Sequence, residues 1–131
     1  MPSAPSRHLK SRIEQGVLVL TVTEPHLRSD KLVDALRQEF LAAIEQSGIN
    51  KVAIDLRAVE SLSSTGLRPL LGVHRHLQPR GGQLVLCGLS PEITRVLSIT
   101  RLVGMSRSPF EVQPDVSSAL ARLNRGPEPN P

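Results

Sequence analysis

Apolar residues change their spacing several times along this chain, and each change predicts a new element. Nearly continuous apolar runs fill residues 17–22, 52–56 and 84–87, as in strands that are covered on both faces of a sheet. Between these runs, apolar residues recur every three or four positions, as on the buried face of a helix. The alternation of the two patterns predicts an α/β fold.

Both ends of this pattern extend the predicted sheet. Residues 10–14 and 17–22 flank Gln15-Gly16 and predict a hairpin in which Gly16 supplies a positive φ. Near the other end, residues 110–112 predict a short edge strand. With the helices added, the order is β-β-α-β-α-β-α-β-α, which predicts a mixed sheet with helices packed on it.

The ends of the four expected helices have recognisable signals. Ser29 or Asp30 caps the first helix, and Gly48 ends it. Ser90-Pro91-Glu92 starts the third helix, and Pro114 starts the fourth. The apolar stripes are Leu32, Val33, Leu36, Phe40, Ala43 and Ile44; Leu67, Leu70, Leu71, His74 and Leu77; Ile93, Val96 and Leu97; and Val116, Ala119, Leu120 and Leu123. Leu102, Val103 and Met105 are expected to complete the core.

Four residues before the second helix carry the clearest candidate chemistry: Ser63, Ser64, Thr65 and Gly66. The hydroxyls can accept hydrogen bonds from the free N–H groups of a first helical turn. The positive end of the helix dipole also favours negative charge at this place, as in phosphate sites. The residues alone leave two interpretations open, a helix cap and a site of reversible phosphorylation that docks a partner.

A resemblance extends this picture to nearly the whole chain. The stretches KVAIDLRAVESLSSTG and GGQLVLCGLSPEITRVLSITRLVGM resemble the STAS domain, which sulfate transporters share with anti-sigma factor antagonists. In that family a strand ending in Asp-Leu precedes an Asp-Ser-Ser-Gly loop or its Ser/Thr variant, and a Gly-Gly turn, a strand and a Ser-Pro helix follow. The resemblance implies an α/β fold with about four to five strands and about four helices mainly on one side of the sheet.

The same resemblance implies roles for individual residues. Thr65 takes the position of the family's phosphorylated Ser, Ser64 that of the preceding Ser, and Ser63 that of an acidic residue. Gly66 matches directly. The partner-binding surface would run from this loop to Arg68, Gly72 and Arg75 on the exposed side of the helix. Because Ser63 replaces the acidic residue and Pro69 enters the first helical turn, phosphorylation of Thr65 or Ser64 is left open.

The function implied by the family is that of an anti-sigma factor antagonist acting by partner switching. Its partner would be an anti-sigma factor of the histidine-kinase-like type, and the chain would have no catalysis or cofactor of its own. Two alternatives stay open: a constitutive STAS interaction module in a signalling assembly, and a domain that binds a small ligand or nucleotide. A homodimer or larger assembly also stays open.

Composition bears on nucleic-acid binding, on the role of the single cysteine and on localisation. Eight Lys and Arg against three Asp and Glu lie between residues 51 and 110, but they are scattered singly, and the chain has no Trp or Tyr on which bases could stack. We therefore expect no direct nucleic-acid binding. The single cysteine, Cys87, lies in an apolar run and is expected to be a core residue. With no membrane-length apolar run or signal peptide, a cytoplasmic protein is expected.

Catalytic and metal-binding arrangements are poorly supported. The G-x-G-x-x-G, P-loop and G-x-S-x-G motifs are missing from the sequence. His74 falls on an apolar helical stripe beyond the loop, which favours a core histidine over a general base for Ser64. His74 and His76 are two positions apart on a helix, so they point in different directions and do not clamp one ion. We expect residues 9–124 to form the domain, between flexible tails at 1–8 and 125–131.

Overall fold

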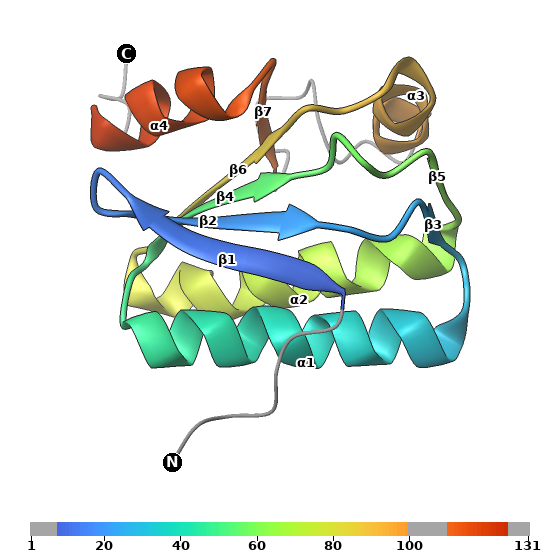
Figure 1. The fold of residues 1–131 in the computed structure, drawn as a ribbon, viewed down its shortest axis with the longest axis horizontal. Helices are drawn as coiled ribbons and strands as arrows, with labels where there is room; N and C mark the ends of the chain where they lie inside the picture. The colour runs from blue at the N-terminus through green and yellow to red at the C-terminus, as the bar shows by residue number, and fades with distance from the viewer. Residues whose placement is uncertain (1–7, 100–109, 126–131) are drawn as a thin grey trace.

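The computed structural model describes residues 8–99 and 110–125, and these residues form an α/β fold (Figure 1). A five-stranded sheet has the order β1-β2-β4-β6-β7, and β3 pairs with β5 in a separate two-stranded sheet. The strands are β1 (Leu9–Glu14), β2 (Val17–Val22), β3 (His26–Leu27), β4 (Lys51–Asp55), β5 (Ser61–Leu62), β6 (Gln83–Cys87) and β7 (Glu111–Gln113). The helices are α1 (Asp30–Ser47), α2 (Arg68–Leu77), α3 (Pro91–Ile99) and α4 (Val116–Asn124), with short 3₁₀ turns η1 (Ser64–Leu67) and η2 (Gln78–Arg80).

The main sheet is mixed, as the sequence predicts. β1 runs antiparallel to β2 through a two-residue turn in which both Gln15 and Gly16 have positive φ. The remaining pairs, β2–β4, β4–β6 and β6–β7, are parallel. Parallel neighbours need a crossover connection, and α1 and α2 supply the first two.

The helices divide unequally between the two faces of the sheet. In Figure 1, α1 and α2 lie together below the sheet and α4 lies above it. Alternate residues of each strand therefore face two separate clusters, since side chains in a strand point to opposite faces. Leu18 and Leu20 join the larger cluster with α1 and α2, whereas Val17 and Val19 pack with α4.

α3 also contributes to the larger cluster, through Ile93 and Leu97. Side chains of α1, α2 and α3 thus join one cluster and those of α4 the other, and the predicted α/β fold with a five-stranded mixed sheet and four helices is confirmed. Connections that run in one direction across a parallel sheet are right-handed and leave their helices on the same face. α4 follows the last strand and is free of that constraint.

Most predicted helix ends are confirmed. The Leu32 backbone N–H donates to Ser29 Oγ at 3.2 Å at the start of α1, and Gly48 ends that helix with φ 67°. The Ile93 N–H donates to Ser90 Oγ at 3.2 Å at the start of α3. Two details differ from prediction. Asp115 rather than Pro114 caps α4, and Val73 is fully buried on α2 although the predicted stripe omitted it.

The Asp115 cap makes the stability of α4 sensitive to acid. The Ser118 backbone N–H donates to Asp115 Oδ1 at 2.8 Å and lowers the pKa of that carboxyl below its ordinary value. A carboxyl with a lowered folded pKa stabilises the fold above its unfolded pKa of about 4, and this contribution disappears as the pH falls through the folded pKa. Asp115→Ser keeps a capping oxygen without the charge.

We therefore expect the melting temperature of the wild type to fall more steeply below about pH 4 than that of Asp115→Ser. Melting curves by circular dichroism between neutral and acidic pH measure this difference. Asp34→Asn, which removes an exposed carboxylate from α1, is the control. Parallel pH profiles for the wild type and Asp115→Ser would contradict the role of the cap charge.

Some sequence predictions fall outside the described residues. These are the flexible tails at 1–7 and 126–131 and the core roles of Leu102, Val103 and Met105. His8 is described and is held in place, because its ring Nδ1 lies 2.7 Å from Glu24 Oε1 and its backbone N–H donates to Glu39 Oε1 at 2.9 Å. A search of the described helices finds none with the length and apolar character needed to cross a bilayer.

Candidate functional site

The hydroxyl loop, residues 63–66, lies between β5 and α2 and is held by the short strand β3. β3 and β5 are parallel, with His26 opposite Ser61 and Leu27 opposite Leu62. The Ser63 backbone N–H donates to the Leu27 carbonyl at 3.2 Å, and the Ser61 N–H donates to the Pro25 carbonyl at 3.1 Å. The loop backbone is therefore positioned by the segment that leads into α1.

Of the two interpretations that the sequence left open for the hydroxyls, the structure does not favour the helix cap. Ser63 occupies the cap position of η1 but makes no side-chain cap bond, and the cap position of α2 is Leu67. A 3₁₀ turn comes first, so backbone carbonyls take the early N–H groups: Gly66 donates to Ser63 at 2.9 Å, and Arg68 donates to Thr65. Pro69 has no N–H to donate. Helix capping therefore does not account for these residues.

The three hydroxyl side chains differ in exposure. Ser64 is exposed, and Thr65 and Ser63 are half-buried. Ser63 Oγ is itself buried and has no hydrogen-bond partner. Since buried polar groups are nearly always bonded, an unbonded hydroxyl at this corner is unusual. The geometry leaves Ser64 and Thr65 accessible at the start of α2, with no hydrogen bond that assigns them to the fold.

Gly66 has a structural role in the loop. It is buried, and a Cβ built on it would collide with the Leu27 carbonyl oxygen and come within 3.1 Å of Leu27 Cβ and 3.0 Å of Leu62 Cβ. The absence of a side chain lets the loop pass against β3. The sequence placed Gly66 at this corner correctly but could not show what lies against it.

The predicted helix surface is only partly continuous. Arg68 and Arg75 are exposed, and Arg68 Nη2 lies 2.7 Å from Asp30 Oδ1 at the start of α1. Gly72 is half-buried beside α1, where a Cβ would lie 3.0 Å from Arg37 Nε. The surface next to the loop therefore includes Arg37 from α1, which no sequence pattern predicts to lie there.

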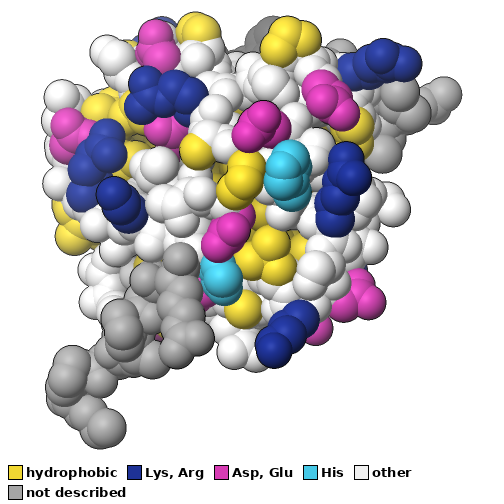
Figure 2. Space-filling model, turned by 45° about the vertical axis from the view of Figure 1, so that its right-hand side comes forward, with side chains coloured by type: hydrophobic (Ala, Val, Ile, Leu, Met, Phe, Trp, Pro, Cys, Tyr) yellow, Lys and Arg dark blue, Asp and Glu magenta, His cyan; other side chains and the backbone are white. Residues whose placement is uncertain are grey.

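Charges on this side of the molecule are mixed. Figure 2 brings forward the side that carries β3 and β5, and Lys, Arg, acidic, His and hydrophobic side chains are interspersed on it. Three of the cations between residues 51 and 110 are paired: Arg57 with Asp55, Arg68 with Asp30 and Arg80 with Glu45. The excess of cations in the sequence thus does not form a single basic face in the part described.

The histidines serve packing and ion pairing. His74 is half-buried, with its ring edge-to-face against Phe110 at a centroid distance of 6.2 Å, as expected for a core histidine. His76 Nε2 lies 2.9 Å from Glu45 Oε1. Among the described residues, no cluster of three or more His, Cys, Asp or Glu side chains could hold a metal ion.

Asp55 lies on the other side of the sheet from His74. Asp55 shares its face of β4 with Ala53, two positions earlier, which packs with α4, whereas α2 covers the opposite face. Asp55 is 3% exposed and accepts a hydrogen bond from the Arg57 N–H at 3.0 Å. A hydrolytic set of Ser64, His74 and Asp55 is therefore not assembled.

A cleft of about 340 Å³ opens beside Asp55, between the carboxyl ends of β4 and β6 and the start of α4. Asp55 and Asp115 contribute acidic groups to it, and Arg12 and Arg57 contribute basic ones. Both arginines already have carboxylate partners, Glu14 for Arg12 and Asp55 for Arg57. Both basic groups of the lining are therefore already matched, and the Asp115 carboxylate caps α4, so the lining does not point to one class of small ligand.

Cys87 is a core residue, as predicted. It is free and fully buried in the cluster under α4, and burial together with the neighbouring Asp55 charge raises the pKa of its thiol to about 12. A thiol with such a pKa is protonated at neutral pH and unreactive.

The fold and the loop together define the family of this chain. The model of the STAS domain matches residues 8–119, and the chain belongs to that family. A Bordetella bronchiseptica protein described as an anti-sigma factor antagonist, BtrV, is 40% identical over 60 residues, which are 46% of this chain and 52% of that protein. The aligned part spans little more than half the length of the curated relatives.

Solved structures agree with this assignment at the level of the fold. A Thermotoga maritima protein described as an anti-sigma factor antagonist aligns with a TM-score of 0.78 and 22% identity, covering 89% of this chain and 95% of that one. Phosphorylated SpoIIAA of Bacillus aligns with a TM-score of 0.62 and 19% identity, covering 88% and 98% of the two chains. The chain is thus a STAS-domain protein similar to anti-sigma factor antagonists.

Proposed function

We propose that this chain is an anti-sigma factor antagonist that works by partner switching. Its unmodified hydroxyl loop and the neighbouring exposed Arg68 and Arg75 would dock on an anti-sigma factor of the histidine-kinase-like type. The chain would act as a ligand and a kinase substrate, with no catalysis of its own. The observation that carries the proposal is the set of hydroxyls at residues 63–65, which stand at the start of α2 without capping it.

Phosphorylation of Thr65 or Ser64 would end the docking. A phosphate adds about −1.5 to −2 charges, three acceptor oxygens and bulk. At the start of a helix this charge is compatible with the fold, because the free N–H groups and the helix dipole favour it. An unmatched charge inside an interface, by contrast, costs several kcal/mol. The switch would therefore lie in docking and leave the fold intact.

Support for this mechanism comes from the relatives. BtrV and the Paenibacillus polymyxa anti-sigma F factor antagonist are described by that role. SpoIIAA, also described as an anti-sigma factor antagonist, has been solved in unphosphorylated and phosphorylated forms on the same type of fold. The exposed Ser64 and half-buried Thr65 are the acceptors that we propose in this chain.

The test uses the histidine-kinase-like anti-sigma factor of the same organism, with ATP. Mass spectrometry of the wild type, Ser64→Ala and Thr65→Val shows whether and where phosphate is added. We expect Thr65→Val to lose the phosphate and keep binding, and Thr65→Glu to bind at least about tenfold more weakly. Thr94→Glu on the exposed part of α3 is the matched control. Equal binding by all variants, with no phosphate incorporated, would refute the switch.

One observation favours a second candidate, a constitutive interaction module. Ser63 stands where the family carries an acidic residue, and Ser63 Oγ has no partner in the structure. Without that acidic group, the neighbouring hydroxyls lose a charge that would help to orient a kinase's metal-bound nucleotide. Partner binding that is indifferent to ATP, combined with weaker binding by Ser64→Glu, would favour this module over the switch.

A further inference from the structure

The outer edge of β1 is the long free edge of the main sheet. β1 has six residues and pairs on one side only, whereas β7 at the other edge has three. In an antiparallel pair, successive residues alternate between bonding to the neighbour and pointing away from it. The Thr23 N–H donates to the His8 carbonyl at 2.9 Å, so the even-numbered residues face β2. The backbone groups of Leu9, Ser11 and Ile13 therefore point outward.

An apolar side chain stands at this edge. Ile13 is 59% exposed and is the one large hydrophobic residue classed as exposed in ranges 8–98 and 110–125. It lies opposite Leu18 on the face that α1 covers. A groove of about 300 Å³ separates this end of the sheet from α1. Its lining consists of Ser11, Arg12, Ile13, Leu18, Ala43, Gln46 and Ser47.

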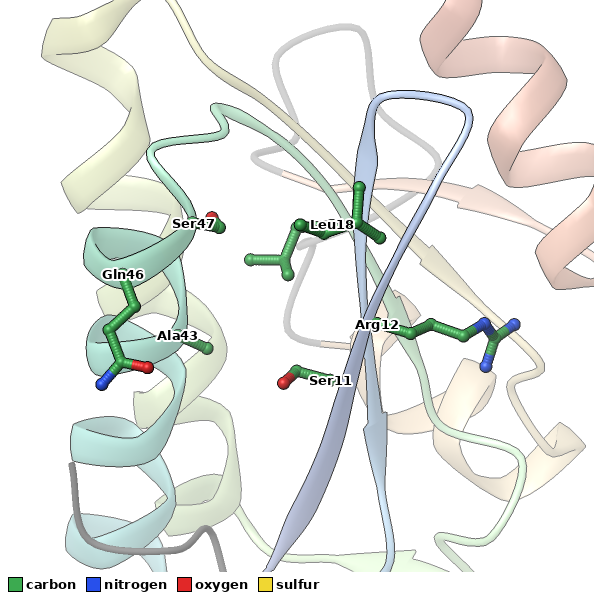
Figure 3. Close-up of a pocket in the computed structure, with 7 residues that line it drawn as sticks. Ser11, Arg12, Leu18, Ala43, Gln46 and Ser47 are labelled. Carbon is green, nitrogen blue, oxygen red and sulfur yellow. The ribbon is translucent and has the colours of Figure 1, made fainter. Parts of the chain in front are cut away.

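Figure 3 shows how the groove is arranged. Leu18 and Ser11 point from the strands toward α1, where Ala43, Gln46 and Ser47 form the opposite wall. Arg12 points to the other side of the sheet. The small side chain of Ser11 thus leaves room beside the free edge, on the same face as the exposed Ile13.

We propose that this edge binds a second copy of the same chain, with the two β1 strands pairing antiparallel about a two-fold axis. Such an interface is self-complementary, and the two sheets become one continuous sheet. Strand addition would satisfy the outward N–H and C=O groups of Ser11 and Ile13, for which no other strand among the described residues is a partner.

The charges of β1 and the position of its turn together select one register. With the two-fold axis at Arg12, Ile13 of each copy lies opposite Ser11 of the other, beside the groove. The same register places Lys10 of each copy opposite Glu14 of the other, so opposite charges meet twice. The two Arg12 side chains also meet at the axis, and this like-charge contact is offset by the Glu14 carboxylates, each 2.8 Å from Arg12 Nε of its own copy and opposite Lys10 of the other.

The neighbouring symmetric registers are less favourable. Moving the axis to Ser11 places Lys10 of each copy opposite Arg12 of the other, and like charges directly opposite are destabilising. Moving it to Ile13 would place Arg12 of each copy opposite Glu14 of the other, but it runs the ladder into the turn at Gln15 and Gly16, where both residues have positive φ. With the two-fold axis between two residues, an outward-pointing residue of one strand lies opposite an inward-pointing residue of the other. Their backbone N–H and C=O groups then cannot pair.

Because each copy contributes one strand and one apolar side chain, the interface belongs to the small class, below about 1,200 Å². The dimer should therefore be reversible and visible only at high protein concentration. Sedimentation velocity over a dilution series that reaches the millimolar range should show a shift from monomer to dimer. A monomer throughout that series would overturn the proposal.

A cysteine cross-link tests the register. Arg12→Cys places the two thiols opposite each other at a non-hydrogen-bonded position, where Cα atoms lie about 4.5 Å apart and a disulfide can form. Ser11→Cys is the matched control, because its thiols would be diagonal neighbours about 7–8 Å apart. The native Cys87 is buried and does not compete. We expect oxidation to yield a dimer of Arg12→Cys much faster than of Ser11→Cys; equal rates would overturn the register.

Exchanging the charges of Lys10 and Glu14 gives an independent test. Lys10 is exposed and Glu14 is half-buried, so these substitutions should leave the fold intact. Lys10→Glu and Glu14→Lys should each weaken dimerisation, and the double exchange should restore it. Lys31→Glu on exposed α1 makes the same charge change away from the edge and should leave dimerisation unchanged. Failure of the double exchange to restore the dimer would count against the proposed pairing.

Discussion

Replacing Gly66 with Ala should destabilise the fold by about 2–3 kcal/mol, a large cost for a single methyl group. The added Cβ would collide with the Leu27 carbonyl oxygen and lie 3.0 Å from Leu62 Cβ. A backbone carbonyl in a strand pair cannot rotate away as a flexible side chain can. The loop or β3 must move instead, and with it the hydrogen bonds that position the hydroxyls.

Gly72→Ala is the matched control on the same helix. There the added methyl meets the Arg37 side chain at 3.0 Å, and this side chain is exposed and can shift. Within a helix, Ala is favoured over Gly by about 0.5–1 kcal/mol, so Gly72→Ala should be neutral or slightly stabilising. Urea denaturation followed by circular dichroism measures both variants. A Gly66→Ala protein as stable as the wild type that loses only partner binding would instead make Gly66 a contact residue.

Replacing Phe40 with Ala should cost about 3–5 kcal/mol, which is much of the 5–15 kcal/mol that holds a domain of this size. Phe40 is 0% exposed and lies in the larger cluster, where α1 packs beside α2 and the sheet. The chain has only two Phe and no Trp or Tyr, so smaller aliphatic side chains surround Phe40 and its removal leaves a cavity that they cannot fill.

The next residue offers a control. Leu41 is half-buried on the same helix, and Leu41→Ala should cost about 1 kcal/mol or less. The midpoint of urea unfolding should therefore fall far more for Phe40→Ala than for Leu41→Ala. Similar midpoints for the two variants would show that the cluster under α1 collapses around the gap, or that α1 contributes little to the stability of the fold.

The residue types of the hydroxyl loop did not predict how its side chains are used in the structure. Ser63, Ser64 and Thr65 are good capping residues, and a regular helix starting after them would have used them. The structure inserts η1 before α2, so backbone carbonyls take the N–H groups that a cap would have served. The hydroxyls are left for another use, which is the basis of the proposed switch.

The sequence did not predict the pair of short strands β3 and β5, for a different reason. β3 and β5 have two residues each, too few for any period in the hydrophobic pattern. Their pairing joins His26 to Ser61 across 35 positions of sequence, and Ser63 is held by Leu27 in the same way. Neither segment has a local sequence pattern that predicts this contact, although the contact fixes the position of the candidate site.

What the sequence determined by itself is the set of elements and their order. The buried strands, the hairpin at Gly16, the caps at Ser29 and Ser90 and the buried Cys87 follow from side-chain chemistry that acts over a few residues. Which residues meet across the fold was decided by tertiary structure: Gly66 against Leu27, Gly72 against Arg37, and Ile13 left exposed at a free edge. These contacts depend on how whole elements pack in space, and no spacing along the chain encodes them.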